Sequence, residues 1–448
     1  MISRWKSLLQ VTLSLTWAGI LLAQSPDLPR AVDLVAKGDY VAAADLLDRI
    51  LKSQPANSDA LNLRGIVAAE QGQLDAAKSW FEKALKVNPK LAEAHTNLGR
   101  LYQRQGQPDL ALSSFNRAAQ VAPGDPEALL NAAILLADQK RYGEAIQALT
   151  RVPQKLRTQP HWETLGRMQL AAGNPGEAER AYEKVLALDP ESVETLRTLS
   201  GLAMKRGDTK TAWNHIAKAR QLAPNSGQIL YEFGYISLAD NHVRDAVNSF
   251  RRAIMMDDKR PEYYGGLIDS LMRTTDYPMA SEVVEKYLRL RPEDPWGYYI
   301  KGWLLFLAGK LDEAVPFLES AAEMDPRQAD PVYLLGRVAY DRGDNSRAQQ
   351  YFQQALQNKP DHAETWLRLG MLHTREGKYE SAEKELRRAA ELDPRDSLTH
   401  LQLSMLLTRM GRIEEAKQEA ELHKKLKAEE SQRIEEAAVT SSGAPIKK

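Results

Sequence analysis

The apolar and polar positions of the chain repeat with a period of 34 residues. The same residue types recur at that spacing in Ala77 and Ala111, Phe81 and Phe115, Ala84 and Ala118, and Pro89 and Pro123. Twelve units follow one another, beginning at residues 24, 58, 92, 126, 159, 193, 227, 261, 295, 329, 363 and 397, and only the unit 126–158 is one residue short. A fixed period of this length is the signature of a repeat architecture in which similar hairpins stack on each other.

Small residues occupy the same places in successive units. The twentieth position is alanine in all twelve units, and the eighth position is small in eleven of them. Bulky residues stand beside these places: leucine is common at the seventh position, and phenylalanine or tyrosine at the twenty-fourth. Because two helices approach closely only where their side chains are small, the pattern predicts one tight helix crossing in each unit.

Glycine and proline mark the ends of the predicted helices. Glycine stands at the fifteenth position of nine units, and proline at the thirty-second position of nine units. Glycine accepts the left-handed conformation that ends many helices, and proline stops a helix that would otherwise continue. Each unit is therefore predicted to be a helix of about 13 residues, a short turn and a second helix of similar length.

The units resemble the tetratricopeptide repeat, whose signature is best preserved in the unit that begins at residue 363. That unit contains Trp366, Leu369, Gly370, Ala382, Leu386, Ala389 and Pro394 at the family's offsets. The resemblance covers residues 24 to about 430. It implies an all-α fold, a right-handed superhelical α-solenoid, in which the first helix of each unit lines a concave channel. The family is defined by packing residues, so the resemblance itself does not identify the ligand, and we expect a protein or peptide partner in the channel.

Two units depart from the pattern. In the unit 126–158, Pro153 shortens the second helix, and the stretch from Val152 to Gln159 is either a hinge or a tolerated local irregularity. In the unit that begins at 261, Ile268 and Tyr287 replace small residues, and Thr275 replaces the usual glycine. We expect a wider separation of the helices at this second place.

The N-terminus resembles a secretory leader. Arg4 and Lys6 precede a mostly apolar stretch from Leu8 to Leu22, and Ala23 offers a small residue for cleavage. Residues 1–23 are therefore predicted to be a signal peptide that directs the protein to the periplasm or outside the cell. The alternative is an uncleaved anchor, although the polar residues within the stretch make it weak as a membrane span.

The remaining chain is divided at the irregularity. We predict an N-terminal array at 24–158, a C-terminal array at 159–430 that includes a capping helix, and a segment at 431–448. In this last segment the capping helix ends near residue 436, and residues 437–448 are expected to be disordered.

Charge and composition exclude several classes of function. Lys plus Arg and Asp plus Glu are both 60, so the formal net charge is zero, and no basic stripe indicates a nucleic-acid partner. The chain has no cysteine, which rules out disulfides and thiolate metal sites and suits an oxidising compartment. The eight histidines lack the spacing of a metal site, and no phosphate-binding or nucleophile motif occurs. We therefore expect no metal, no cofactor and no enzymatic activity.

The candidate binding residues come from the second, fifth, ninth and twelfth positions, which the resemblance places on the channel wall. In the C-terminal array these positions hold aromatic residues and one arginine: Tyr231, Tyr235, Trp296, Tyr299, Trp303, Phe306, Tyr333, Arg337 and Tyr340. We expect these rings to bind an apolar or aromatic segment while Arg337 fixes a carboxylate or stacks. The alternative is that the rings only fill contacts between repeats.

The N-terminal array is more polar on the corresponding wall. Asn97 and Asn131 stand at the sixth position of consecutive units. They weakly resemble the asparagine ladder with which some relatives hold an extended peptide backbone, and the alternative is that they are polar filler.

The sequence thus favours a scaffold or adaptor of the bacterial cell envelope that binds a partner segment in its channel. The alternative function is a substrate-recruiting or assembly subunit of an exported enzyme or polymer-secretion complex.

Overall fold

The computed structural model describes residues 27–442, with side chains up to residue 433. All regular secondary structure in that range is helical, and short turns join the helices. The predicted leader at 1–23 and the last six residues lie outside the described residues. The chain divides into two units, the first ending at Asp208 and the second beginning at Thr209. This division falls inside the repeat that begins at residue 193. The predicted division at 158/159 stays a prediction.

Unit 1 contains eleven α-helices and one short 3-10 helix among its described residues. They are α1 (Leu28–Ala36), α2 (Tyr40–Ser53), α3 (Ser58–Glu70), α4 (Leu74–Val87), α5 (Ala92–Arg104), α6 (Pro108–Val121), α7 (Pro126–Asp138), α8 (Tyr142–Arg151), η2 (Gln154–Leu156), α9 (Gln159–Ala171), α10 (Pro175–Leu188) and α11 (Val193–Lys205).

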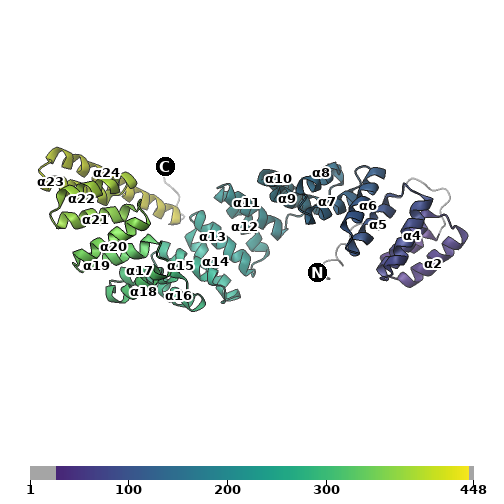
Figure 1. Cartoon of the computed structure of the whole chain (residues 1–448), viewed down its shortest axis with the longest axis horizontal. Helices are drawn as coiled ribbons and strands as arrows, with labels where there is room; N and C mark the ends of the chain where they lie inside the picture. Colours follow the sequence, from purple (N-terminus) through teal and green to yellow (C-terminus); the bar gives the residue numbers. More distant parts are fainter. Residues whose placement is uncertain (1–26, 443–448) are drawn as a thin grey trace. The chain divides into compact units, whose positions relative to one another are not determined.

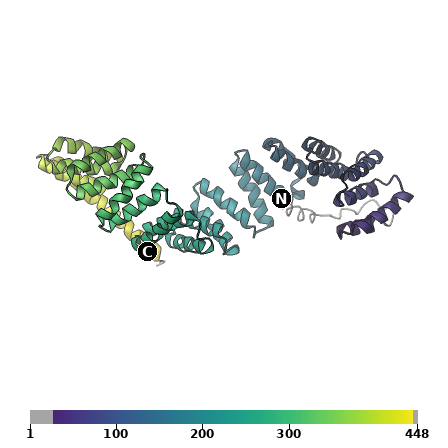
Figure 2. The same ribbon diagram turned by 60° about the horizontal axis from the view of Figure 1, so that its bottom comes forward.

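Unit 2 continues the same pattern. Its helices are α12 (Thr209–Leu222), α13 (Gly227–Ala239), α14 (Val243–Met256), α15 (Pro261–Arg273), α16 (Tyr277–Leu290), α17 (Pro295–Leu307), α18 (Leu311–Met324), α19 (Ala329–Asp341), α20 (Asn345–Asn358), α21 (Ala363–Arg375), α22 (Tyr379–Leu392), α23 (Ser397–Arg409) and α24 (Ile413–Ser442). Within each unit the helices, apart from α11 and α12 on either side of the division, pair into antiparallel hairpins that stack in chain order (Figures 1 and 2). The all-α solenoid predicted from the sequence is confirmed.

Every first helix from α3 to α23 has 13 residues, as the repeat predicted. Side-chain caps fix many of the starts. Asn57 accepts a hydrogen bond from the backbone N–H of Ala60 at 3.0 Å, and Asp344 accepts one from Arg347 at 3.1 Å. These caps satisfy N–H groups that have no partner inside the helix.

The turn between the two helices of a hairpin needs one residue in the left-handed conformation. The nine glycines at the fifteenth position have φ between 71° and 82°. The three units without glycine adopt the same conformation, with φ of 61° at Lys140, 60° at Asn241 and 55° at Thr275. Hairpin packing therefore imposes the left-handed turn even on residues that disfavour it.

The predicted helix crossing is confirmed in detail. The twelve alanines at the twentieth position are all buried. At the eighth position a Cβ on Gly336 would come within 2.6 Å of the Phe352 ring, and one on Gly65 within 2.5 Å of the Phe81 ring. The ring of the second helix thus occupies the space that a side chain on the first helix would need.

The hairpin α15/α16 reverses the sizes at this crossing. Ile268 replaces the small residue, and the aromatic position is occupied by the smaller Val284. Both side chains are buried in one apolar cluster. Volume is thereby redistributed between the two helices instead of being added.

Tyr287 is accommodated in a similar way by the next hairpin. A Cβ on Gly297 would lie 3.0 Å from the Tyr287 ring, so the absence of a side chain there makes room for it. The Tyr287 ring meets Trp296 edge to face, with centroids 5.1 Å apart, and its hydroxyl donates to Asp294. The extra bulk of α16 is absorbed at the start of α17.

The first helices form the inner side of each stack. Successive first helices such as α13 and α15, α17 and α19, or α19 and α21 touch each other directly, whereas second helices make no comparable contacts in the described part. Helices that approach each other more closely line the concave side of a curved stack. Within the hairpin α15/α16 the two helices make fewer close backbone contacts than in α13/α14 or α17/α18. This supports the wider helix separation predicted for the unit that begins at residue 261.

The irregular stretch after α8 is closed by hydrogen bonds. The Arg157 guanidinium donates to the carbonyls of Val152 and Thr150, both at 3.0 Å. His161 caps α9 through Thr158, and its Nε2 lies 2.9 Å from the Pro126 carbonyl. These contacts favour a packed local irregularity over a hinge.

The capping helix is longer than the sequence suggested. α24 runs to Ser442, six residues past the predicted end near 436, so the expected disorder is wrong for residues 437–442. The physical reason is that Ala437 and Ala438 favour helix and no glycine or proline follows before Gly443. Among the helices of residues 27–442, none combines the length and apolarity needed to cross a bilayer.

The strained turn at Thr275 leads to a first prediction. Replacing Thr275 by glycine removes the steric cost of a β-branched residue at positive φ, and we expect the free energy of unfolding to rise by roughly 0.5–1 kcal/mol. Urea unfolding measures the change. The reciprocal control, Gly343→Thr, is expected to lower the free energy of unfolding by at least as much. Equal midpoints for all three proteins would contradict this account.

The reversed crossing of α15/α16 leads to a second prediction. Gly336→Ile alone overfills the α19/α20 crossing and should cost about 2–3 kcal/mol. Phe352→Val alone leaves a cavity at a similar cost. We expect the double variant to lose at least about 1 kcal/mol less than the sum of the two, because the new side chains share one space. Additive losses in urea unfolding would show that the two positions do not interlock.

Candidate functional site

The predicted site residues lie on three inner helices of unit 2 and two of unit 1. α17 and α19 are in direct contact and provide most of the set. α17 holds Trp296, Tyr299, Trp303 and Phe306, and α19 holds Tyr333, Arg337 and Tyr340. α13 supplies Tyr231 and Tyr235. Asn97 on α5 and Asn131 on α7 belong to the other unit and do not join this group.

The rings on α17 are partly buried, and they connect two hairpins. Tyr299 and Trp303 stack with centroids 5.8 Å apart and an interplanar angle of 26°. Both contact the apolar cluster beneath α15–α17 and the cluster beneath α17–α20. They therefore do fill contacts between repeats, but each ring keeps an accessible part.

Arg337 extends the aromatic surface onto α19. Its guanidinium carbon lies 5.1 Å from the Phe306 ring centroid, and its Nη1 donates to the Tyr333 hydroxyl at 3.3 Å. The expected stacking of Arg337 is thus present. Its Nε is buried and has no hydrogen-bond partner.

Tyr333 packs against a buried histidine at the start of α21. The rings of Tyr333 and His362 are 5.1 Å apart. His362 Nε2 lies 3.1 Å from Asp330 Oδ1, and its Nδ1 lies 3.6 Å from Glu364 Oε2. The hydrogen bond from His362 holds the pKa of Asp330 below its ordinary value. His362 Nδ1 accepts a hydrogen bond from the backbone N–H of Thr365 at 3.2 Å, so the imidazole binds the Asp330 carboxylate through Nε2 and caps α21 through Nδ1.

The hydroxyls of Tyr231 and Tyr299 have raised pKa values. Burial raises the pKa of Tyr299, and the charges of Asp330 and Glu364 raise it further. Burial, together with Tyr235, raises the pKa of Tyr231 to about 12. At neutral pH these groups act as neutral hydrogen-bond donors and acceptors and not as bases.

The aromatic group on α13 is a second part of the inner face. Tyr231 and Tyr235 meet edge to face at 4.9 Å, and Tyr235 also meets Phe250 at 5.5 Å. Tyr235 has the most exposed ring of the predicted set, at 47%. α15, whose inner positions include Gly265 and Asp269, separates this group from α17.

The two asparagines of unit 1 have different surroundings. Asn97 Nδ2 donates to Asn62 Oδ1 at 3.0 Å, which joins α5 to α3. Asn131 Nδ2 is buried without a hydrogen-bond partner. One amide thus has an internal role and the other is shielded, so their use as a ladder for a peptide stays a prediction.

Two arginines on α21 lie beside this surface and were not among the candidate residues predicted from the sequence. Arg375 lies 3.6 Å from the Tyr340 ring centroid and donates to the Tyr340 carbonyl at 3.2 Å. Arg368, at the sixth position, has a buried Nε without a partner, as Arg337 does. Two contacts between neighbouring first helices, Tyr340 to Arg375 and Asn62 to Asn97, join residues that are 35 apart in the sequence. Comparing polar residues at this spacing could have pointed to Arg375.

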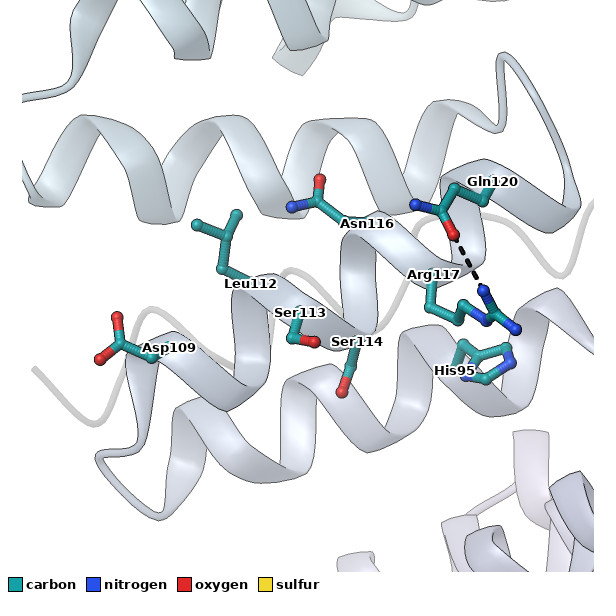
Figure 3. A pocket seen from close by; sticks show the side chains of 8 residues that line it. All are labelled: His95, Asp109, Leu112, Ser113, Ser114, Asn116, Arg117 and Gln120. Carbon is teal, nitrogen blue, oxygen red and sulfur yellow. Dashed lines mark hydrogen bonds between the residues drawn. The ribbon is translucent and has the colours of Figure 1, made fainter.

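A shallow cavity of about 610 Å³ lies against α6 in unit 1 (Figure 3). Its lining is mostly polar: His95, Asp109, Leu112, Ser113, Ser114, Asn116, Arg117 and Gln120. His95 Nε2 lies 3.1 Å from the Pro89 carbonyl, and Arg117 donates to Gln120 at 3.1 Å. These groups are engaged with each other and with the backbone, and they do not form a nucleophile–base pair. Within residues 27–433, no three His, Asp or Glu side chains gather as metal ligands.

Comparisons with known proteins agree with the repeat pattern. Models of the tetratricopeptide repeat match residues 58–124, 96–160, 169–234, 266–329 and 333–397, which together make up more than half of the chain. A TPR repeat-containing protein of Pseudomonas aeruginosa is 26% identical over 159 residues, which is 35% of this chain and 27% of that protein. The chain thus matches about a quarter of the length of this curated relative.

Similar solved structures include repeat proteins of low sequence identity. The Cut9–Hcn1 hetero-tetramer of the APC/C contains a chain that is 15% identical, with 88% of this chain and 92% of that chain covered and a TM-score of 0.45. The C-terminal part of a TPR repeat-containing protein from Cytophaga hutchinsonii is 17% identical, with coverages of 54% and 99% and a TM-score of 0.46. With the family models matched along most of its length, this chain belongs to the tetratricopeptide repeat family.

Proposed function

We propose that the protein is a non-enzymatic scaffold or adaptor that holds a segment of a partner protein against the inner face of α17 and α19. Members of this repeat family bind protein partners. The observation that supports this site is the row of partly exposed rings formed by Tyr299, Trp303 and Phe306 beside Tyr333.

Stacking of the hairpins does not require these rings. The fifth and ninth positions of α9 hold Glu163 and Arg167, and α9 still packs between its neighbours. The aromatic residues at both of these positions of α17, and at the fifth position of α19, therefore support a further role in binding. Tyrosine and tryptophan are the residues that most often anchor protein interfaces, because they offer a large contact area at small entropic cost.

Partly exposed rings can still supply binding energy when a partner covers them. Covering about 400 Å² of apolar surface yields about 10 kcal/mol before the costs of association. Those costs remove several kcal/mol, which leaves roughly micromolar affinity for a single segment. Such affinity suits a scaffold that exchanges its partner.

The third prediction tests this face by affinity capture. We expect Trp303→Ala with Tyr299→Ala to abolish capture of the partner from cells of the source organism. Because both rings also contact two apolar clusters, thermal unfolding must show that the repeats remain folded, and Tyr235→Ala provides a milder variant on the exposed end of the face.

Trp80 on α4 offers a matched control. Its ring is also partly buried, but it packs beside Lys83 in unit 1, at 4.3 Å from the ammonium. Trp80→Ala should leave capture unchanged. Capture that survives the α17 variants, or that is lost equally with Trp80→Ala, would refute the proposed site.

We further propose that the protein works in the bacterial cell envelope, after export. The basic start, the apolar stretch from Leu8 to Leu22 and the small Ala23 support a cleaved leader, and the absence of cysteine is compatible with an oxidising compartment.

A fourth prediction concerns this leader. Protein recovered from the periplasmic or extracellular fraction should begin at Gln24, as read by mass spectrometry of the intact chain. Replacing Ala23 by a bulky residue should block cleavage and retain the full-length chain in the membrane fraction. A full-length chain in the cytosolic fraction of the wild type would contradict export, and a full-length membrane-bound wild type would identify the segment as an anchor.

A further inference from the structure

Two glycines stand next to each other in α15, and only one of them is needed for packing. A Cβ on Gly266 would lie 2.4 Å from the Phe250 ring, so a side chain there would overlap the neighbouring hairpin. A Cβ on Gly265 would lie 3.8 Å from the Tyr287 ring and 4.0 Å from the Trp296 ring, which are ordinary contact distances. Alanine at residue 265 would therefore fit the fold without movement of its neighbours.

Gly265 interrupts a row of tyrosines on the inner face. It stands at the fifth position of its repeat, and the neighbouring first helices hold Tyr231 in α13, Tyr299 in α17 and Tyr333 in α19 at that position. Glycine inside a helix is less stable than alanine because its unfolded backbone has more freedom to lose. The fold thus has a gap at residue 265 that lowers its stability and that its packing does not require.

Aromatic rings border the gap on both sides. On the α13 side, Tyr235 meets the Phe250 ring with centroids 5.5 Å apart, and this is the same ring that Gly266 abuts. On the α17 side, the rings of Tyr287 and Trp296 meet edge to face at 5.1 Å. α13 and α15 are in direct contact, and these rings pack around one apolar cluster. The surroundings of Gly265 are therefore mainly aromatic.

The polar groups of the bordering rings are already engaged. The Tyr287 hydroxyl donates to Asp294, and Asp294 also accepts from the backbone N–H of Trp296 at 3.0 Å. Burial raises the pKa of Tyr287, and the hydrogen bond to Asp294 raises it further, with a smaller contribution from Tyr235. This last contribution places the Tyr235 phenol close to that of Tyr287, across α15.

The carboxylates on the same face of α15 have partners as well. Glu262, one turn before Gly265, pairs with Arg260 at 3.0 Å, and Asp269, one turn after it, pairs with Arg273 at 3.4 Å. A charged group placed over Gly265 would lose its water without finding a free partner of opposite charge. An apolar group would instead cover the exposed parts of the rings, which is favourable. The chemistry of the gap thus selects an apolar occupant.

We propose that the gap at Gly265 is a subsite that receives one large apolar side chain of the partner segment, between the rings of Tyr235 and Trp296. The inference rests on the proposed function and adds the place and the size of one anchoring residue, a leucine, methionine or phenylalanine. It also explains the glycine, because any side chain at residue 265 would occupy the space of the partner's side chain. The segment bound by α17 and α19 accordingly continues across α15 towards α13.

Thermal unfolding tests the premise that the fold does not need this glycine. We expect Gly265→Ala to unfold roughly 1–3 °C above the wild type, because alanine fits and favours the helix. Gly266→Ala should unfold below the wild type, because its methyl group would overlap the Phe250 ring. A loss of stability in Gly265→Ala would show that packing requires the glycine, and the inference would fall.

Peptides selected with the full protein provide the probe. Short random peptides are displayed and captured by the wild type, and the affinity of the best peptide is measured by fluorescence anisotropy. We expect each large apolar residue of that peptide to be replaceable by alanine in turn, with one replacement weakening binding roughly 10- to 100-fold through the gap, as loss of a buried anchor does.

Gly265→Leu identifies the residue that occupies the gap. The leucine fills the gap from the protein side, so this variant should bind the selected peptide roughly 10- to 100-fold more weakly than the wild type does. The peptide with alanine at the anchoring position should bind the variant and the wild type within about 3-fold of each other. Such coupling between two substitutions indicates direct contact. A folding defect cannot imitate this result, because it would weaken the binding of both peptides.

Gly201 on α11 offers a matched control. It also stands at an inner position of a first helix, and a Cβ there would meet nothing within 4 Å. No aromatic residue occupies the inner positions of α11, so the same substitution makes no change to a ring-bordered gap. Gly201→Leu should bind both peptides as the wild type does.

The outcomes separate this subsite from the proposed function. Wild-type affinity of Gly265→Leu for the selected peptide, or an equal loss for both peptides, would overturn the subsite alone, provided that Trp303→Ala still abolishes binding. A charged residue at the coupled position would contradict its apolar chemistry. If no peptide is selected, or if the selected peptides bind Trp303→Ala unchanged, the proposed function fails and this inference fails with it.

Discussion

The fold depends on the close approach of two helices within each hairpin, where a small residue on the first helix faces a ring or leucine on the second. At Gly336 a single added methyl group would overlap the Phe352 ring. This contact sets the helix separation, places alanine at the base of every crossing and fixes the direction in which the next hairpin must stack. Because each repeat contacts only its neighbours, the rule has to be met locally in every unit and cannot be compensated at a distance.

Departures from the rule are balanced within the same hairpin or the next one. The larger Ile268 is matched by the smaller Val284, and the bulky Tyr287 is received by Gly297. The second exchange brings the Tyr287 ring edge to face against Trp296 of α17. A change that begins as core packing therefore alters the surface on which a partner is proposed to bind.

Charged residues are used in two different ways in unit 2. Arg387 and Arg412 form a network with Glu383 and Glu415 that joins α22 to α24, next to the end of the solenoid. On the inner face, Arg337 is held by a ring and a hydroxyl instead of a carboxylate. The two sets of arginines therefore have different surroundings: the first stabilises the contact between α22 and α24, and Arg337 packs within the aromatic surface.

The sequence by itself determined the repeat length, the helix pairs, the crossing residues and the helices that hold the aromatic positions, because each follows from local periodicity and from steric demands that recur in every unit. It also identified Thr275 as an irregular turn residue, although only the structure revealed that the turn keeps its left-handed form there. Tertiary structure decided which side chains meet: it formed the Tyr299–Trp303 stack, paired Asn97 with Asn62, and buried the Nε atoms of Arg337 and Arg368 without hydrogen-bond partners. Those features depend on the rotamers and on the register between hairpins, and a periodic pattern along one chain contains neither.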